Sequence, residues 1–133
     1  MAIEAGLVME FTKTVEESDT ARASGGASLP LVLSTPKLIS LLEQAAHAAL
    51  VPHLPEGQGS VGALVNVRHL AATPVGMAVR VRAELVEVDG RRARFKVEAW
   101  DAVDKIAEGE HERFIIDRAR FEERLEKKRQ AIR

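Results

Sequence analysis

The chain has 133 residues, a net charge of −1 at pH 7, 46% hydrophobic and 29% charged residues, and no cysteine. This length suits a single domain that buries roughly two-thirds of the surface of its unfolded chain. The near-zero charge gives no global attraction for nucleic acid, and the lack of cysteine excludes disulfides and thiolate chemistry.

The first residues, MAIEAGLVMEF, have no basic region followed by a long apolar run, so they do not resemble a secretory signal. No stretch of the sequence reaches the roughly 18–20 apolar residues that a membrane-spanning helix needs. We therefore expect a cytoplasmic protein whose partners include neither a membrane nor nucleic acid.

Residues 7–15 mix β-branched and polar side chains and are expected to form a first strand. Residues 16–28 are rich in Ser, Ala, Asp and Gly, and predict a mobile loop. A simple connector is the default interpretation of this loop. The alternative is a lid, because loops beside a site often cover it.

Residues 34–50 (STPKLISLLEQAAHAAL) carry apolar residues at every third or fourth position, the pattern of an amphipathic helix. Pro36 suits the first helical position, which places Thr35 at the N-cap. Pro52 cannot continue the helix. Glu43 falls on the flank of the apolar stripe, so we expect its carboxylate at the boundary of the core, where it can be functional.

Four further segments alternate between apolar and polar residues and predict antiparallel strands in a meander: residues 61–70, 77–88, 92–100 and 105–116. The dipeptide Asp89-Gly90 indicates a hairpin with a type I′ turn, which needs positive φ at both central positions. One face of this sheet is apolar, and the helix over residues 34–50 is the expected cover.

His69 belongs to the apolar set of its strand, where a histidine is usually a hydrogen-bonded core or boundary residue. Gly62 in the same strand indicates a bulge or a close approach by a backbone or ligand. Residues 118–133 form a charged helix or tail with a basic excess, which we separate from a domain over residues 1–117. A solvated helix is the default interpretation, and a contribution to binding a phosphorylated ligand is the alternative.

The sequence has no glycine-rich phosphate loop, HExxH, CxxC or GxSxG motif, and its four histidines have no metal-ligand spacing, so we expect no metal. The remaining candidates are Thr35, Glu43, Gly62 and His69, a set that suits acyl transfer or hydrolysis. Thr35 and Glu43 are eight residues apart, about 12 Å along a helix axis. Both would have to line one elongated pocket.

Several segments resemble the fluoroacetyl-CoA thioesterase family, a branch of the hotdog fold. The matching stretches cover most of residues 30–117: the Thr35-to-Glu43 spacing, EGQGSVG at 56–62, VRHLAATPVGM at 67–77, AELVEVDGRR at 83–92 and GEHERF at 109–114. The resemblance implies an α+β fold with a single hotdog domain, in which a five-stranded antiparallel sheet wraps around one long central helix. The charged C-terminal helix follows this domain.

The resemblance also implies a catalytic triad of Thr35, Glu43 and His69. The family's glycine beside the thioester falls on Gly62, and an arginine near the site falls on Arg113. We expect the CoA portion to follow a basic surface formed by Arg68 and Arg113.

The family's lid phenylalanines are replaced by Gly26 and Leu29, which argues against fluoroacetyl selectivity but does not affect thioester hydrolysis. We expect an acyl-CoA thioesterase acting on a small or medium acyl group. It would need no cofactor, since CoA is part of the substrate, and would form a homodimer or possibly a tetramer. The alternatives are a non-catalytic acyl-CoA-binding regulatory module and a hotdog hydratase or dehydratase.

Overall fold

The computed structural model describes residues 3–132. The elements in chain order are β1 (Val8–Thr14), a 3₁₀ turn η1 (Glu17–Asp19), α1 (Ala21–Gly25), α2 (Thr35–Leu50), η2 (Val51–His53), β2 (Gln58–His69), β3 (Ala78–Asp89), β4 (Arg92–Trp100), β5 (Lys105–Asp117) and α3 (Arg118–Gln130). The strands predicted from the sequence are confirmed, with bounds shifted by at most three residues.

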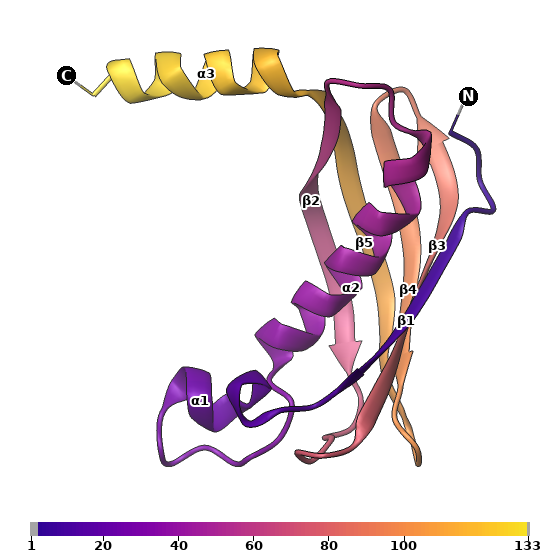
Figure 1. Ribbon diagram of the computed structural model, residues 1–133, viewed down its shortest axis with the longest axis vertical. Helices are drawn as coiled ribbons and strands as arrows, with labels where there is room; N and C mark the ends of the chain where they lie inside the picture. Colours follow the sequence, from indigo (N-terminus) through magenta and orange to yellow (C-terminus); the bar gives the residue numbers. More distant parts are fainter. Residues whose placement is uncertain (1–2, 133) are drawn as a thin grey trace.

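One antiparallel sheet holds all five strands in the order β1-β3-β4-β5-β2, and α2 lies across its concave face (Figure 1). The architecture of a five-stranded sheet around a central helix is therefore confirmed. The contact is apolar because seven α2 residues are buried: Leu38, Leu41, Leu42, Ala45, Ala46, Ala49 and Leu50. Alternate residues of β3 and β4 face them, including Val81, Leu85, Phe95 and Val97, each 0% exposed.

The predicted four-strand meander is wrong for β2, which pairs with β5 at the opposite edge from β1. The segment after β2 does not close a hairpin with β3. Its backbone instead pairs with the segment that precedes α2. Thr73 accepts a hydrogen bond from the Leu33 amide at 2.8 Å, and Pro74 forms a bridge with Val32. The chain therefore leaves β2, contacts the segment that precedes α2, and enters β3 on the far side of the sheet.

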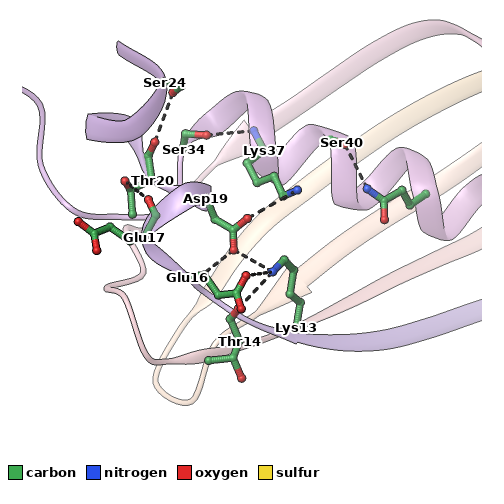
Figure 2. Close-up of polar contacts among 11 residues, drawn as sticks. Lys13, Thr14, Glu16, Glu17, Asp19, Thr20, Ser24, Ser34, Lys37 and Ser40 are labelled. Carbon is green, nitrogen blue, oxygen red and sulfur yellow. Dashed lines mark hydrogen bonds and ion pairs between the residues drawn. The ribbon is translucent and has the colours of Figure 1, made fainter. Parts of the chain in front are cut away.

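The predicted mobile loop over residues 16–28 contains η1 and α1, so the loop prediction is wrong in part. Each short element has its own cap. The Asp19 side chain accepts from the Glu16 amide at 2.9 Å, and the Thr20 hydroxyl accepts from the Ala23 amide at 3.2 Å. Figure 2 shows these side chains where the segment meets the start of α2.

The N-cap of α2 is Ser34, whose hydroxyl accepts from the Lys37 amide at 3.1 Å; the prediction of Thr35 at this position is wrong. Pro36 occupies the second helical position, where its missing N–H also has no partner within the helix. The shift by one residue has a functional consequence, because Thr35 is released from capping and its hydroxyl is available to another group.

The hairpin predicted at Asp89-Gly90 is confirmed by the antiparallel pairing of β3 with β4, but the predicted type I′ turn is wrong. Asp89 pairs with Arg92, so the two-residue loop is Gly90–Arg91. Gly90 has φ +61°, and no non-glycine residue within 3–132 has a positive φ. Positive φ at the first central position alone is the φ pattern of a type II′ turn.

The helix α3 begins after Asp117, whose side chain accepts from the Arg120 amide at 3.0 Å, and extends away from the sheet (Figure 1). The boundary between residues 1–117 and 118–133 stays a prediction. Across residues 3–132, no helix combines the length and the apolar composition needed to cross a membrane.

Candidate active site

Thr35 and His69 meet where the start of α2 approaches the end of β2. The Thr35 Oγ1 and His69 Nδ1 atoms are 2.8 Å apart, although the residues are 34 positions apart in the chain. Ser34 caps the helix, so the Thr35 hydroxyl is free to make this contact. A hydroxyl hydrogen-bonded to an imidazole can pass its proton to that ring, the arrangement needed to activate a hydroxyl or protonate a leaving group.

The His69 imidazole is half-buried, and its Nε2 atom is buried without a hydrogen-bond partner among residues 3–132. Burial lowers the pKa of His69 below its ordinary 6.5, and the backbone of Ala71 opposes that shift. The ring is therefore neutral at pH 7 and available as a proton acceptor.

Glu43 lies two turns further along α2, with its carboxylate against the backbone of Gly62 in β2. A Cβ built on Gly62 would be 2.6 Å from Glu43 Oε1, closer than real Cβ contacts allow. The strand also shifts register between Gly62 and Leu64, so a bulge follows the glycine directly. The bulge expected at Gly62 is confirmed, whereas the close approach is made by the side chain of Glu43 and not by the expected backbone or ligand.

The Arg113 guanidinium lies behind Gly62, on β5. Its side chain is buried, and its Nε donates to Ser60 Oγ at 2.8 Å while Nη2 donates to the Ser60 carbonyl at 3.1 Å. Burial lowers the pKa of Arg113. The negative charge of Glu43 opposes this shift, but the net pKa stays lowered. Arg68, the other arginine expected near CoA, is exposed on β2.

The candidate residues thus fall into two groups along the contact between α2 and β2, with Arg113 of β5 behind the second group. Thr35 and His69 form the first group, and Glu43 and Gly62 form the second. Thr35 and Gly62 are exposed and Glu43 is half-buried, so both groups are open to solvent on this single chain. An elongated substrate lying along β2 could contact both.

Three polar residues next to this site were not singled out from the sequence: His47, Ser60 and His111. The His47 Nδ1 atom is 2.7 Å from Ser60 Oγ, and His111 Nε2 accepts from Arg113 Nη1 at 3.1 Å. The sequence did contain a signal for His111. The alternation of β5 places His111 on the same core-facing side as Ala107 and Ile115, which indicates a buried ring. Among residues 3–132, no three His, Cys, Asp or Glu side chains gather closely enough to hold a metal ion.

Comparisons with known proteins find the same family in sequence and in structure. The family model for fluoroacetyl-CoA-specific thioesterase (FlK) matches residues 15–119. A fluoroacetyl-CoA thioesterase of Streptantibioticus cattleyicolor is 42% identical over 102 residues, which cover 77% of this chain and 73% of that protein.

Two solved structures have the same fold over nearly the whole chain. The crystallised fluoroacetyl-CoA thioesterase FlK superposes with a TM-score of 0.91 and 35% identity, covering 96% of this chain and 98% of that one. A Thermus thermophilus hypothetical protein described as a thioesterase superfamily member gives a TM-score of 0.87 and 31% identity, covering 98% of both chains.

Proposed function

The chain belongs to the fluoroacetyl-CoA-specific thioesterase family and has the hotdog fold, and we propose that it is an acyl-CoA thioesterase. Its reaction is the hydrolysis of a small or medium acyl-CoA to the free acid and CoA. The observation that carries the site assignment is the 2.8 Å contact between Thr35 and His69, formed along the same helix that presents Glu43 to Gly62.

In this proposal Glu43 acts on the carbonyl carbon of the thioester. Its carboxylate either attacks that carbon or takes a proton from the water that attacks it. The Gly62 N–H or the N-terminus of α2 stabilises the negative charge that develops on the carbonyl oxygen. Because Gly62 has no side chain, the thioester can approach Glu43 from the solvent side of β2.

His69 and Thr35 handle the proton in the same proposal. With its proton on Nε2, the His69 ring accepts the Thr35 hydroxyl hydrogen at Nδ1. The CoA thiolate leaves as the C–S bond breaks, and the Thr35–His69 pair relays to its sulfur the proton given up by the water that hydrolyses the thioester, so that the ring is neutral again at the end. Water supplies the oxygen of the released acid, so the reaction needs no cofactor, and CoA enters only as part of the substrate.

The thioesterase proposal is tested by following free thiol release from a panel of acyl-CoAs. We expect turnover by the wild type and a loss of at least about 100-fold in kcat for Glu43→Ala and His69→Ala. Binding of an acyl-CoA without any thiol release would instead indicate a binding module. Hydration of an enoyl-CoA would indicate a hydratase, and full activity of both variants would overturn the site assignment.

We also propose that Arg68 contacts the phosphates of CoA, because its guanidinium is exposed on the strand beside the site. Arg113 is buried and is a poorer candidate for this role. Replacement of Arg68 by Ala should raise KM for acyl-CoA more than it lowers kcat, since the phosphates lie far from the reacting carbon. An unchanged KM would exclude Arg68 from CoA binding.

The protein is further proposed to be a homodimer joined through β2. This 12-residue strand lies at the sheet edge, pairs only with β5 within residues 3–132, and exposes Leu64 (42%) and Val65 (40%). A long apolar edge of this kind pairs readily with a second copy. That pairing would cover the open side of the site, which lies on the same strand.

Sedimentation velocity measures the assembly directly. We expect a dimer for the wild type and a monomer for Leu64→Asp, because a carboxylate would be buried at the paired edges. Val103→Asp is the matched control, since Val103 is 77% exposed in the turn before β5. A monomeric wild type would contradict the proposal, and a tetramer would show a further interface.

The cytoplasm is the proposed location, where we expect the acyl-CoA substrates to be available. A chain without cysteine gains nothing from an oxidising compartment. Fractionation of producing cells tests this location, and recovery of the protein outside the cytoplasm would contradict it.

A further inference from the structure

Two neighbouring polar side chains of β5 point into the core, which is unusual for a strand whose other inward positions are apolar. His111 is 1% exposed and Arg113 is 8% exposed. A buried guanidinium is costly unless its N–H groups are bonded and its charge is balanced. The surroundings of Arg113 show how both needs are met.

Three different nitrogens of Arg113 are bonded. Nε and Nη2 donate to the hydroxyl and the carbonyl of Ser60, and Nη1 donates to His111 Nε2 at 3.1 Å. These bonds attach the guanidinium to β2 on one edge and to its own strand on the other. A planar group held on three sides has a fixed orientation.

The tautomer of His111 follows from its two neighbours. Its Nδ1 lies 2.8 Å from the Leu64 carbonyl, which can only accept, so Nδ1 carries the proton. Its Nε2 faces a guanidinium, which can only donate, so Nε2 is the acceptor. Burial lowers the pKa of His111, which keeps the ring neutral, as this arrangement requires.

The second need, balance of charge, is met across Gly62. The place where a Gly62 Cβ would lie is 2.6 Å from Glu43 Oε1, 3.4 Å from His111 Cε1 and 3.5 Å from Arg113 Nη1. The carboxylate and the guanidinium therefore face each other over a backbone without a side chain. No direct hydrogen bond joins Glu43 to Arg113 within residues 3–132, so the attraction acts through space.

We propose that His111 and Ser60 are positioning residues that hold the Arg113 guanidinium toward Glu43, so that the fixed positive charge keeps the Glu43 carboxylate oriented at the thioester. This inference rests on the proposed function and deepens it by assigning Arg113 to Glu43 rather than to the CoA phosphates. A charge that is already in place costs no reorganisation during the reaction.

His47 forms the outer end of the same network. Ser60 Oγ accepts from Arg113 Nε, so its own hydrogen is available to the His47 Nδ1 atom 2.7 Å away. Burial, and then the charge of Arg113, lower the pKa of His47, which favours the neutral ring that can accept this hydrogen. The chain of bonds thus runs from α2 through β2 to β5 and ends at the Leu64 carbonyl.

The test compares two replacements of His111 that differ in hydrogen bonding. His111→Gln offers a carbonyl oxygen to Arg113 and an amide N–H to the Leu64 carbonyl, whereas His111→Phe fills the space beside Phe95 and offers neither. We expect His111→Phe to lower kcat by roughly 10-fold or more, with KM changed by less than about 3-fold, because the substrate still binds while the carboxylate is misplaced. His111→Gln should restore most of kcat.

Several outcomes decide the proposal. Equal kcat for the two variants, or loss of kcat only in proportion to the loss of folded protein, would overturn it. If His111→Phe does not fold, Ser60→Ala replaces it: we expect a several-fold lower kcat at unchanged KM, and wild-type kcat in that variant would overturn the proposal. An absence of thiol release by the wild type itself would be a failure of the thioesterase function instead.

A second readout does not depend on turnover. The Nε–H of a guanidinium held by Ser60 should exchange slowly with solvent and give a distinct nitrogen–proton NMR signal in the wild type and in His111→Gln. The same signal should broaden or exchange faster in His111→Phe. A signal unchanged by His111→Phe would show that the ring does not hold Arg113.

Discussion

At the scale of single residues, the contact between Gly62 and Glu43 depends on space and not on backbone conformation. Gly62 is not among the glycines with positive φ, so an L side chain would fit its backbone. The obstacle is Glu43 Oε1, 2.6 Å from where a Cβ would lie, with Arg113 Nη1 at 3.5 Å behind it. A methyl group at this position must displace the carboxylate.

We therefore expect Gly62→Ala to fold with a nearly unchanged melting temperature and to lose roughly 10-fold or more in kcat. Thiol release and thermal unfolding measure the two quantities. Gly59→Ala, three residues earlier on β2, is the control, because its Cβ would make only ordinary van der Waals contacts, with Arg118 side-chain carbons at 3.5 and 3.6 Å and Ile116 Cγ1 at 3.9 Å. Full activity of Gly62→Ala would show that the carboxylate can move without cost.

At the scale of secondary-structure elements, the start of α2 is held by a buried carboxylate from the preceding segment. Asp19 lies 2.9 Å from the Lys13 ammonium of β1 and 3.6 Å from that of Lys37 on α2 (Figure 2). Burial raises the pKa of Asp19, but hydrogen bonds from the Glu16 amide and Lys13 outweigh it, and the net pKa is lowered. The carboxylate thus joins β1 to the helix that begins with Thr35.

Replacement of Asp19 by Asn should lower the free energy of unfolding by about 1–2 kcal/mol, since the amide can still accept from Glu16 N–H but loses both ion pairs. Urea unfolding at low salt and near 1 M salt measures this loss, which should shrink as salt screens the lysines. Glu16→Gln is the control, because its carboxylate is 69% exposed and 3.5 Å from Lys13. A salt-independent loss would argue against the ion pairs.

At the scale of the whole molecule, three of the four histidines share one property. His47, His69 and His111 each have a pKa below 6.5, with burial as the largest cause. Below pH 6.5 the unfolded chain therefore binds protons that the folded chain does not. Stability must then rise with pH through this window and fall as the pH drops below it.

We expect the free energy of unfolding to decrease between pH 7.5 and 5.5, on the order of 1 kcal/mol per pH unit for each fully buried histidine. Urea unfolding at fixed protein concentration measures it. His111→Gln cannot titrate, so its pH dependence should be weaker than that of the wild type. An identical dependence would show that His111 does not contribute.

Much of the fold could be predicted because each element carries its own local pattern. The alternation of Val79, Val81, Ala83 and Leu85 and the stripe from Leu38 to Ala49 correctly predicted the buried faces of β3 and α2. Local patterns do not report which strand edges meet, and for this reason the meander was predicted wrongly for β2. The cap of α2 was misplaced because Pro36 was assigned to the first helical position, whereas it occupies the second and Ser34, the stronger capping residue, takes the N-cap.

The candidate site was likewise predicted in part from the sequence and decided in part by the tertiary structure. Glu43 on the helix flank and Gly62 and His69 on their strand were visible in the sequence, and the family resemblance joined Thr35, Glu43 and His69 before any geometry was known. The bond from Thr35 to His69, the approach of Glu43 to Gly62, and the chain from His47 through Ser60 and Arg113 to His111 were decided only by the tertiary structure. A sequence determines which face of its own element a side chain occupies, whereas a distance of 2.8 Å between residues 34 positions apart depends on how α2 crosses β2.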